Sequence, residues 1–281
     1  MSARERAWLN LLRLSGLLLV LIVLSVFALI TINGARVISM EFLLQGPKKG
    51  MTEGGIYPAI VGSFLLSILT MVFAVPLGVL SAIYLNEYAS KGILIRIVRL
   101  SIRNLSGVPS IVYGLFGLGL FVALLGLGHS MLSASLSLAL LSLPITITAS
   151  EEALKSVPNS FREGALALGA SKWESIRHNV LPSALPGIAT GTILALARAI
   201  GETAPILLTG AAFFLPRLPS TIFDQFMALP YHIFILSTQH SKIEAVRPLA
   251  YGTTLVLIAI GGLLNLIAIL IRRRTRSMKV W

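Results

Sequence analysis

Long apolar segments recur along this chain, each close to the length that a helix needs to cross a lipid bilayer. A helix requires about 20 predominantly apolar residues to span roughly 30 Å of hydrocarbon. The chain contains six segments of this kind, which are Leu14–Ile32, Ala59–Leu85, Val108–Leu127, Met131–Ser150, Ala184–Gly210 and Leu249–Ile271. These segments predict an all-α integral membrane protein with six transmembrane helices.

The composition supports this fold class and excludes several others. Hydrophobic residues make up 56% of the chain and charged residues 12%, against about 25% charged residues in a typical soluble domain. The net charge of +12 comes from residues at the ends of the apolar segments, and no basic tract interleaved with aromatic residues indicates nucleic-acid binding. The absence of cysteine excludes disulfides, thiolate metal sites and a cysteine nucleophile.

The distribution of lysine and arginine orients the predicted helices. Sixteen of these residues fall in the two termini and in the loops after the second and fourth segments, and six fall in the other loops. Because cytoplasmic loops are enriched in Lys and Arg, both termini are expected to face the cytoplasm. The first segment follows Arg4, Arg6 and Arg13, but it is too long for a signal-peptide core and precedes no Ala-x-Ala site. We therefore expect it to be retained.

Two of the predicted outer loops are long. Residues 33–58 carry turn-forming glycine and proline residues. Residues 211–248 contain an amphipathic stretch, about 221–238, that is interrupted by Asp224 and Pro230. This stretch is too polar to span the membrane, so it predicts an interfacial helix on the outer face.

Small residues and prolines occur at several positions inside the predicted helices. Glycines spaced for close helix contact occur at Gly114-x-x-Gly117-x-Gly119, Gly187-x-x-x-Gly191 and Gly261-Gly262. Pro76 and Pro205 lie inside apolar segments, where each is expected to kink the helix. These features indicate helix packing.

The loop between the fourth and fifth segments has the pattern of two short capped helices. Ser160-x-x-Glu163 fits a capping box that opens the first helix, and Gly169 is suited to end it in the left-handed conformation. Ser171-x-x-Glu174 repeats the capping box for a second helix, which is predicted to end near Leu181-Pro182. A loop built in this way indicates either docking to another protein or packing against the helix bundle.

Two charged residues, Arg198 and Glu202, lie inside the fifth apolar segment. A charge at this depth costs at least about 2.5–3.5 kcal/mol on insertion scales, so it usually serves a function. Their spacing predicts both side chains on one face of a helix, one turn apart. A guanidinium beside a carboxylate suits a protonated oxyanion, and it equally suits a structural salt bridge, so both interpretations stay open. Thr203 adds a hydroxyl that either contacts the same anion or bonds to its own helix backbone.

The cytoplasmic loop resembles the EAA motif of ABC importer permeases. The matching residues are Glu163, Gly164, Ala165, Gly169, Leu181 and Pro182, with glycine at position 164 where the family has alanine. The resemblance implies that this loop forms coupling helices, which insert into a groove of a cytoplasmic ATPase.

Two further stretches, Gly107–Gly117 and Arg198–Pro205, resemble the phosphate-uptake permeases of this family. The Ala204-Pro205 ending and the stretch Pro230–Ile233 are similar to the PstA type of subunit rather than to its PstC partner. The resemblance covers about residues 55–270. It implies a permease subunit of an ATP-driven importer of inorganic phosphate in a prokaryotic inner membrane. Arg198, Glu202 and Thr203 are the residues expected to contact the substrate.

The resemblance also implies a domain organisation and a set of partners. Residues 1–58 would form an N-terminal transmembrane helix and outer loop, residues 59–271 a type I permease core with the EAA loop at about 151–182, and residues 272–281 a basic cytoplasmic tail. The expected partners are a PstC-like permease, a dimeric cytoplasmic ATPase that binds ATP and magnesium, and an extracytoplasmic phosphate-binding protein. The chain itself is expected to hold no cofactor and no metal, and Ala170 replaces the lysine that a phosphate-binding loop needs.

Several alternatives remain open. An ABC permease for another oxyanion, such as phosphonate or molybdate, would have the same fold. A secondary anion transporter or channel would use Arg198 and Glu202 as a proton relay, but it leaves the capped cytoplasmic loop unexplained. A sensing subunit without transport is a third alternative. An intramembrane hydrolase is disfavoured, because no pair of histidines has metal-ligand spacing.

Overall fold

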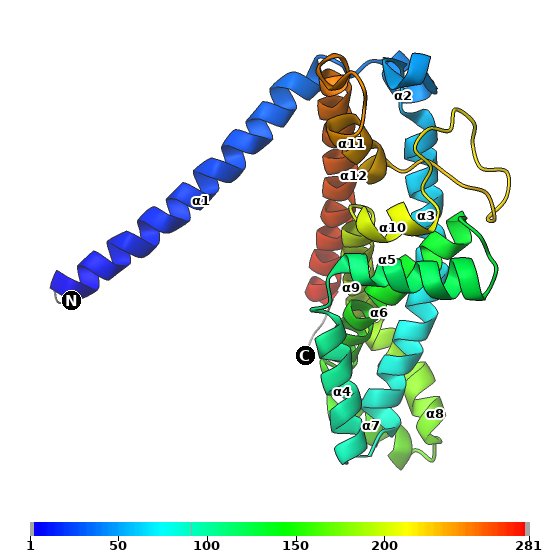
Figure 1. The fold of residues 1–281 in the computed structure, drawn as a ribbon. Helices are drawn as coiled ribbons and strands as arrows, with labels where there is room; N and C mark the ends of the chain where they lie inside the picture. Colours follow the sequence, from blue (N-terminus) through cyan, green and yellow to red (C-terminus); the bar gives the residue numbers. More distant parts are fainter. Residues whose placement is uncertain (1–2, 91, 279–281) are drawn as a thin grey trace.

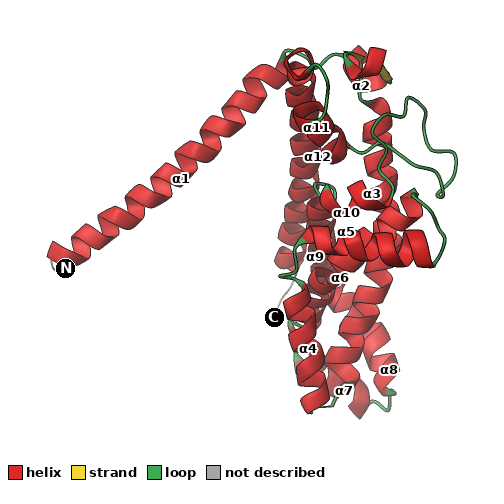
Figure 2. Ribbon diagram, in the orientation of Figure 1, coloured by secondary structure: helices red, strands yellow, loops and turns green. Residues whose placement is uncertain are grey.

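A computed structural model describes residues 3–90 and 92–278 of the chain. The described part is helical except for its loops and one small hairpin (Figure 2). The α-helices are α1 (Ala3–Ala35), α2 (Met40–Leu44), α3 (Tyr57–Ile83), α4 (Ile93–Leu105), α5 (Ser110–Gly117), α6 (Met131–Lys155), α7 (Asn159–Ala167), α8 (Lys172–Ser175), α9 (Leu181–Ala199), α10 (Ala204–Thr209), α11 (Leu229–Thr238) and α12 (Ile243–Met278). The remaining elements are the antiparallel strands β1 (Pro47–Lys48) and β2 (Glu53–Gly54), the 3-10 turn η1 (Lys49–Met51), and the π-helical segments η2 (Tyr84–Tyr88), η3 (Leu118–Leu124) and η4 (Ile176–Val180).

The long helices α3, α6, α9 and α12 form a bundle with α4, α7 and α8 at its lower end and α2 and α11 at its upper end (Figure 1). Helix α1 joins this bundle at its own upper end and leans away from it below (Figure 1). Within the described residues, five helices are long and apolar enough to cross a membrane, and α4 with α5 forms a bent pair that could count as a sixth span. The predicted all-α membrane fold is confirmed.

Close contacts between helices explain several of the glycines. A Cβ built on Gly187 or Gly191 of α9 would lie 2.8 or 2.5 Å from the Cβ of Ala153 or Ala149 of α6. These glycines therefore let α9 approach α6, as predicted. Gly114 and Gly117 of α5 likewise approach α10 and α6. Gly119, Gly261 and Gly262 have no neighbour within 4 Å among the described residues, so their predicted packing role is not seen within this chain.

The third predicted span, Val108–Leu127, forms a continuous helix from Ser110 to Leu124, and this helix is sharply bent away from the helix before it. Helix α4 ends at Leu105, and the pair formed by α4 and α5 is bent by 101°. Gly107 and Pro109 occupy the bend, and a proline disfavours the helical conformation of the residue before it. Helix α5 consequently lies across the long helices at mid-height (Figure 1).

The fifth predicted span, Ala184–Gly210, is wrong at both ends. The helix is continuous from Lys172 to Ala199, so the second loop helix does not end near Leu181-Pro182. Its inner part includes the π-helical η4, which comes directly before the turn carrying Pro182. After Ala199 the chain turns and starts the short helix α10, with Pro205 at its N-terminal end. Pro205 thus opens a new helix, because a proline fits the first turn, where no N–H bond is needed.

The cytoplasmic loop matches its predicted caps in part. Ser171 and Glu174 form the predicted capping box, and Gly169 has the predicted left-handed conformation, with φ +86°. The capping box predicted at Ser160 and Glu163 is wrong. The N-cap of helix α7 is Pro158, two residues earlier, and no side chain caps the helix.

The helix predicted for about 221–238 forms only from Leu229 to Thr238. Residues 217–228 are irregular, and α11 begins only at Leu229. Six residues of α11 are buried, because it packs against α12 and α3; they are Leu229, Pro230, Tyr231, His232, Ile235 and Leu236. A β-branched and aromatic sequence that looks amphipathic is therefore part of the protein core.

The irregular segment before α11 is held by the surrounding helices. The Leu229 N–H donates to Ser63 Oγ of α3 at 2.8 Å, and the Met131 N–H at the start of α6 donates to the Asp224 carbonyl at 2.9 Å. The Asp224 carboxylate accepts bonds from the N–H groups of Thr221 and Ser220, which hold its pKa below the usual value. Non-helical backbone at such a position is tolerated because protein groups satisfy it.

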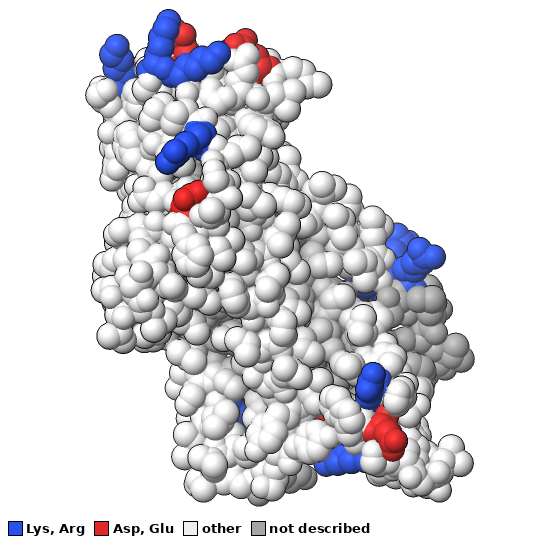
Figure 3. Space-filling view, turned by 90° about the vertical axis from the view of Figure 1, so that its right-hand side faces the viewer, with Lys and Arg blue, Asp and Glu red and all other residues white. Residues whose placement is uncertain are grey.

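Charged side chains are distributed unevenly along the long axis of the molecule. On the face shown in Figure 3, most of them gather toward the upper and lower ends, and the left side of the middle region is uncharged. This distribution fits a protein whose middle lies in hydrocarbon. Helix α12 continues through the basic residues Arg272–Arg274 to Met278, so the predicted tail is helical as far as it is described.

Candidate functional site

Arg198 lies in the last turn of α9, beside the break that separates α9 from α10. Its side chain is 56% exposed, and its Nε lies 3.6 Å from Oε1 of Glu202, whose side chain is 18% exposed. A separation of this length is a weak ion pair. The guanidinium therefore keeps most of its donors available within the described part of this chain.

The predicted geometry of this pair needs one correction. Glu202 lies beyond the end of α9, so the two residues do not share one helix face. The chain turns instead through backbone bonds from Gly201 N to the Arg198 carbonyl and from Glu202 N to the Ala199 carbonyl, at 3.0 and 3.1 Å. This turn returns the carboxylate to the guanidinium, so the pair forms although the helix has ended.

Thr203 follows directly and is half-buried at the N-cap of α10. Its carbonyl accepts the Leu207 N–H at 3.0 Å. Among the described residues, no side-chain bond from Thr203 caps α10. The alternative in which this hydroxyl bonds to its own helix is therefore not seen.

The break between α9 and α10, which carries Glu202 and Thr203, is held by contacts with α5 and with the start of α6. A Cβ on Gly114 of α5 would lie 3.0 Å from the Ala204 carbonyl, and the Ser130 N–H donates to the Thr209 carbonyl at 3.1 Å. Helix α10 thus rests on α5 and on the start of α6, level with the end of α9 (Figure 1). The packing of these short helices fixes where α9 ends and hence where Arg198 projects.

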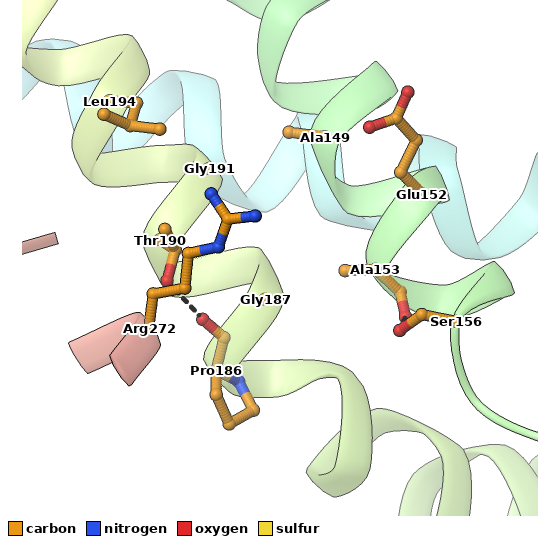
Figure 4. Close-up of a pocket in the computed structure, with 10 residues that line it drawn as sticks. All are labelled: Ala149, Glu152, Ala153, Ser156, Pro186, Gly187, Thr190, Gly191, Leu194 and Arg272. Atoms are coloured by element: carbon orange, nitrogen blue, oxygen red, sulfur yellow. Dashed lines mark hydrogen bonds between the residues drawn. The ribbon is translucent and has the colours of Figure 1, made fainter. Parts of the chain in front are cut away.

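A separate cavity of about 420 Å³ lies between α6, α9 and the end of α12 (Figure 4). Arg272 points into the space between α9 and α6, with Glu152 and Thr190 on its walls (Figure 4). Arg198, Glu202 and Thr203 do not line this cavity. The predicted substrate residues therefore lie outside this cavity, and the Arg198 side chain is exposed on the single chain.

Four residues of the EAA motif lie at the lower end of the bundle, on α7 and the turn after it (Figure 1), whereas Leu181 and Pro182 open α9. Glu163, Gly164 and Gly169 are exposed, and Leu181 packs partly against the lower core cluster. Leu168, which directly precedes the turn, is 91% exposed, and the neighbouring Trp173 is 47% exposed. These two side chains form an exposed apolar surface beside the turn at Gly169.

A family comparison identifies the chain. Residues 74–277 match the family described as "Binding-protein-dependent transport system inner membrane component". The chain belongs to this family. A probable ABC transporter permease protein of Bacillus subtilis, YqgI, is 35% identical over 259 residues, which cover 88% of this chain and 87% of the relative. The "Phosphate transport system permease protein PstA 1" of Mycobacterium tuberculosis is 38% identical over 231 residues, which cover 82% of this chain and 74% of the relative.

Solved structures agree with the fold of this family. A chain of a bacterial ABC transporter involved in the import of the acidic polysaccharide alginate superposes with a TM-score of 0.66, covering 98% of this chain and 97% of that chain at 18% identity. A chain of the inward-facing MetNI methionine transporter superposes with a TM-score of 0.57, covering 80% and 94%. The chain is thus a multi-pass inner membrane protein with a type I importer permease fold. Membership of the family implies a paired permease, an ATPase and a substrate-binding protein as partners.

Proposed function

We propose that this chain is the PstA-type permease of an ATP-driven importer of inorganic phosphate. It forms the translocation path with a PstC-like permease, receives phosphate from an external binding protein, and is driven by a dimeric cytoplasmic ATPase. The sequence similarity to phosphate permeases over most of the chain supports this proposal. The ATPase subunits, and not this chain, bind ATP and magnesium.

Arg198 contacts phosphate in transit. The observation that carries this role is a permanent guanidinium, more than half exposed and only weakly paired, at a helix break inside apolar sequence. A guanidinium presents a fork of donors that matches phosphate oxygens and cannot lose its charge near neutral pH. The Arg198 side chain is exposed on this chain, which leaves room for the second permease to complete the site.

Glu202 and Thr203 give the site its selectivity. Phosphate keeps a proton near neutral pH, and the Glu202 carboxylate accepts a hydrogen bond from it. Sulfate has no such proton and meets the negative carboxylate unpaired, so the site discriminates by repulsion as well as by attraction. Binding here is weak, because an anion that is held tightly cannot leave the path.

The first experiment compares Arg198→Ala and Arg198→Lys in phosphate uptake, with assembly of the complex measured separately. Losing a charged hydrogen-bond donor costs about 1.5–3 kcal/mol, so Arg198→Ala should lower uptake by about tenfold or more. Arg198→Lys keeps the charge but loses the fork, so it should lower uptake less. Normal uptake by both assembled variants would remove Arg198 from the path.

The second experiment addresses the substrate. Glu202→Gln removes the negative charge and should let sulfate compete with phosphate, whereas wild type should ignore sulfate. Phosphonate and molybdate are tested as competitors in the same assay. If either displaces phosphate from the wild-type transporter better than phosphate itself, the chain serves another oxyanion.

The third experiment addresses coupling. Leu168→Asp places a charge on the most exposed leucine of the coupling loop and should release the ATPase during purification. The matched control is Leu44→Asp on α2, at the other end of the molecule, where the leucine is 62% exposed. Equal ATPase yield from both variants would show that the Leu168 surface does not bind the ATPase.

A further inference from the structure

The guanidinium of Arg162 joins three elements at the lower end of the molecule. Its Nε and Nη2 bond the Glu87 carboxylate at distances of 2.7–3.2 Å. Its Nη1 donates to the Val157 carbonyl at 2.9 Å and its Nη2 to the Leu154 carbonyl at 3.0 Å. Arg162 belongs to α7, Glu87 to η2 at the end of α3, and the two carbonyls to the end of α6 and the turn after it.

This ion pair is well shielded from solvent. The side chain of Arg162 is 18% exposed and that of Glu87 only 6%. Glu87 also accepts a bond from Asn86 Nδ2 at 2.8 Å. A bidentate arginine–carboxylate pair in such a setting fixes both the distance and the relative orientation of the elements that carry it.

Besides this ion pair, Phe161 of α7 packs partly against the lower apolar cluster, which contains Ala82 and Ile83 of α3. None of residues 159–167, all of which the structure describes, is buried. Between α7 and its neighbours lies a cavity of about 280 Å³, bordered by Glu87, Arg162 and Leu166. Apolar packing is therefore incomplete here, and the ion pair is a direct polar link across the gap.

The chain connectivity leaves α3 in a special position. The coupling loop continues directly into α9 through α8 and η4, and residues 156–158 join it to α6. Helix α3 is distant in sequence and reaches the loop only through side chains. At its upper end, α3 holds the irregular segment before α11 through Ser63 and through Gly62, whose added Cβ would meet the Met227 carbonyl. A rigid helix that is held by contacts at both ends transmits a displacement of one end to the other.

We propose that Arg162 and Glu87 are positioning residues that couple the ATPase-driven movement of the EAA loop to α3. The inference rests on the proposed function. It adds a link from the EAA loop to α3, besides the covalent connections of this loop to α6 and α9. Loss of the pair leaves the loop attached to α6 and α9 and removes its polar link to the inner end of α3, which itself stays packed on α6. The ATPase then hydrolyses ATP without a matching movement of the outer part of the translocation path.

The test uses the complete transporter in proteoliposomes and measures phosphate accumulated per ATP hydrolysed. Glu87→Gln and Arg162→Lys each weaken the bidentate pair, and both should lower this ratio by at least about fivefold while the ATPase co-purifies in wild-type amounts. The matched control is Glu244→Gln, which removes the charge from the exposed outer pair Glu244–Arg247 (2.6 Å) and should leave the ratio unchanged. An unchanged ratio in both inner variants overturns the proposal.

A rescue experiment separates coupling from folding. The chain has no cysteine, so Glu87→Cys with Arg162→Cys can be joined specifically by a short bifunctional thiol reagent. The ratio should be low before cross-linking and recover after it, which a purely stabilising pair would not produce. The same ratio of phosphate to ATP before and after cross-linking overturns the proposal. The proposal is also overturned if Glu87→Gln fails to assemble while Arg162→Lys is fully coupled. Absence of phosphate accumulation by wild type would refute the proposed substrate instead.

Discussion

At the scale of single residues, the backbone of α3 is in direct contact with irregular chain. Gly62 faces the Met227 carbonyl so closely that an added Cβ would collide with the oxygen. The next residue, Ser63, is 5% exposed and accepts the Leu229 N–H. A larger residue at position 62 would push the segment away and break this bond. Glycine and serine here allow a loop to lie at helix depth with its polar groups satisfied.

This contact leads to a prediction on stability. Gly62→Ala forces a methyl group against backbone that has little room to move, and overpacking of this kind costs typically about 1–3 kcal/mol. The control is Gly119→Ala, since Gly119 has no neighbour within 4 Å among the described residues. The thermal midpoint of the detergent-solubilised protein should fall for the first variant and stay near wild type for the second. Equal midpoints would show that the close contact is relaxed in the membrane protein.

At the scale of secondary structure, the coupling loop contains two glycines, Gly169 and Gly164, that differ in backbone conformation and surroundings. Gly169 has φ +86°, a conformation that other residues rarely adopt, and it ends the turn after α7. Gly164 lies inside α7, where no neighbour within 4 Å of an added Cβ excludes a side chain. Only the first glycine is required by the backbone.

The two glycines therefore predict opposite effects of the same substitution. Gly164→Ala should stabilise α7 by about 0.5–1 kcal/mol, because glycine inside a helix costs conformational entropy. Gly169→Ala should destabilise the turn by about 1–2 kcal/mol, the cost of a left-handed residue with a Cβ. ATPase co-purification should persist or rise in the first variant and fall in the second. If the two variants retain equal amounts of ATPase, the turn does not position the docking surface.

At the scale of the whole molecule, the polar ends and the apolar middle define its direction in the membrane. The EAA loop and the amphipathic helix α4 lie at one end, and the hairpin and α2 lie at the other (Figure 1). Because lysine and arginine are more abundant in the loops at the first end, that end is expected to be cytoplasmic.

Thiol labelling checks this orientation in a chain without native cysteine. We introduce Leu168→Cys, where the residue is 91% exposed, or Lys49→Cys, where the side chain is 71% exposed. A membrane-impermeant maleimide should label Lys49→Cys in right-side-out vesicles, and Leu168→Cys only in inverted vesicles from which the ATPase has been removed. The reverse pattern would mean that the EAA loop cannot meet a cytoplasmic ATPase.

Properties that depend on local sequence could be predicted from the order of the residues. Membrane class, the long apolar helices, the Ser171 cap and the Gly169 turn follow from hydropathy or from a few adjacent residues. The EAA motif identified the loop for the same reason. The proximity of Arg198 and Glu202 was also predicted, although the physical reason for it is a turn beyond the helix end and not the shared helix face that the spacing indicated.

Tertiary contacts settled the remainder. Whether an apolar run continues as a helix, breaks as at Ala199 or bends as at Pro109 depends on the neighbours that satisfy the freed backbone groups. The burial of α11 and the pairing of Arg162 with Glu87, 75 positions apart, arise in the same way. Hydropathy depends only on the segment itself, whereas the energy of a broken helix or a shielded charge depends on groups supplied from far along the chain.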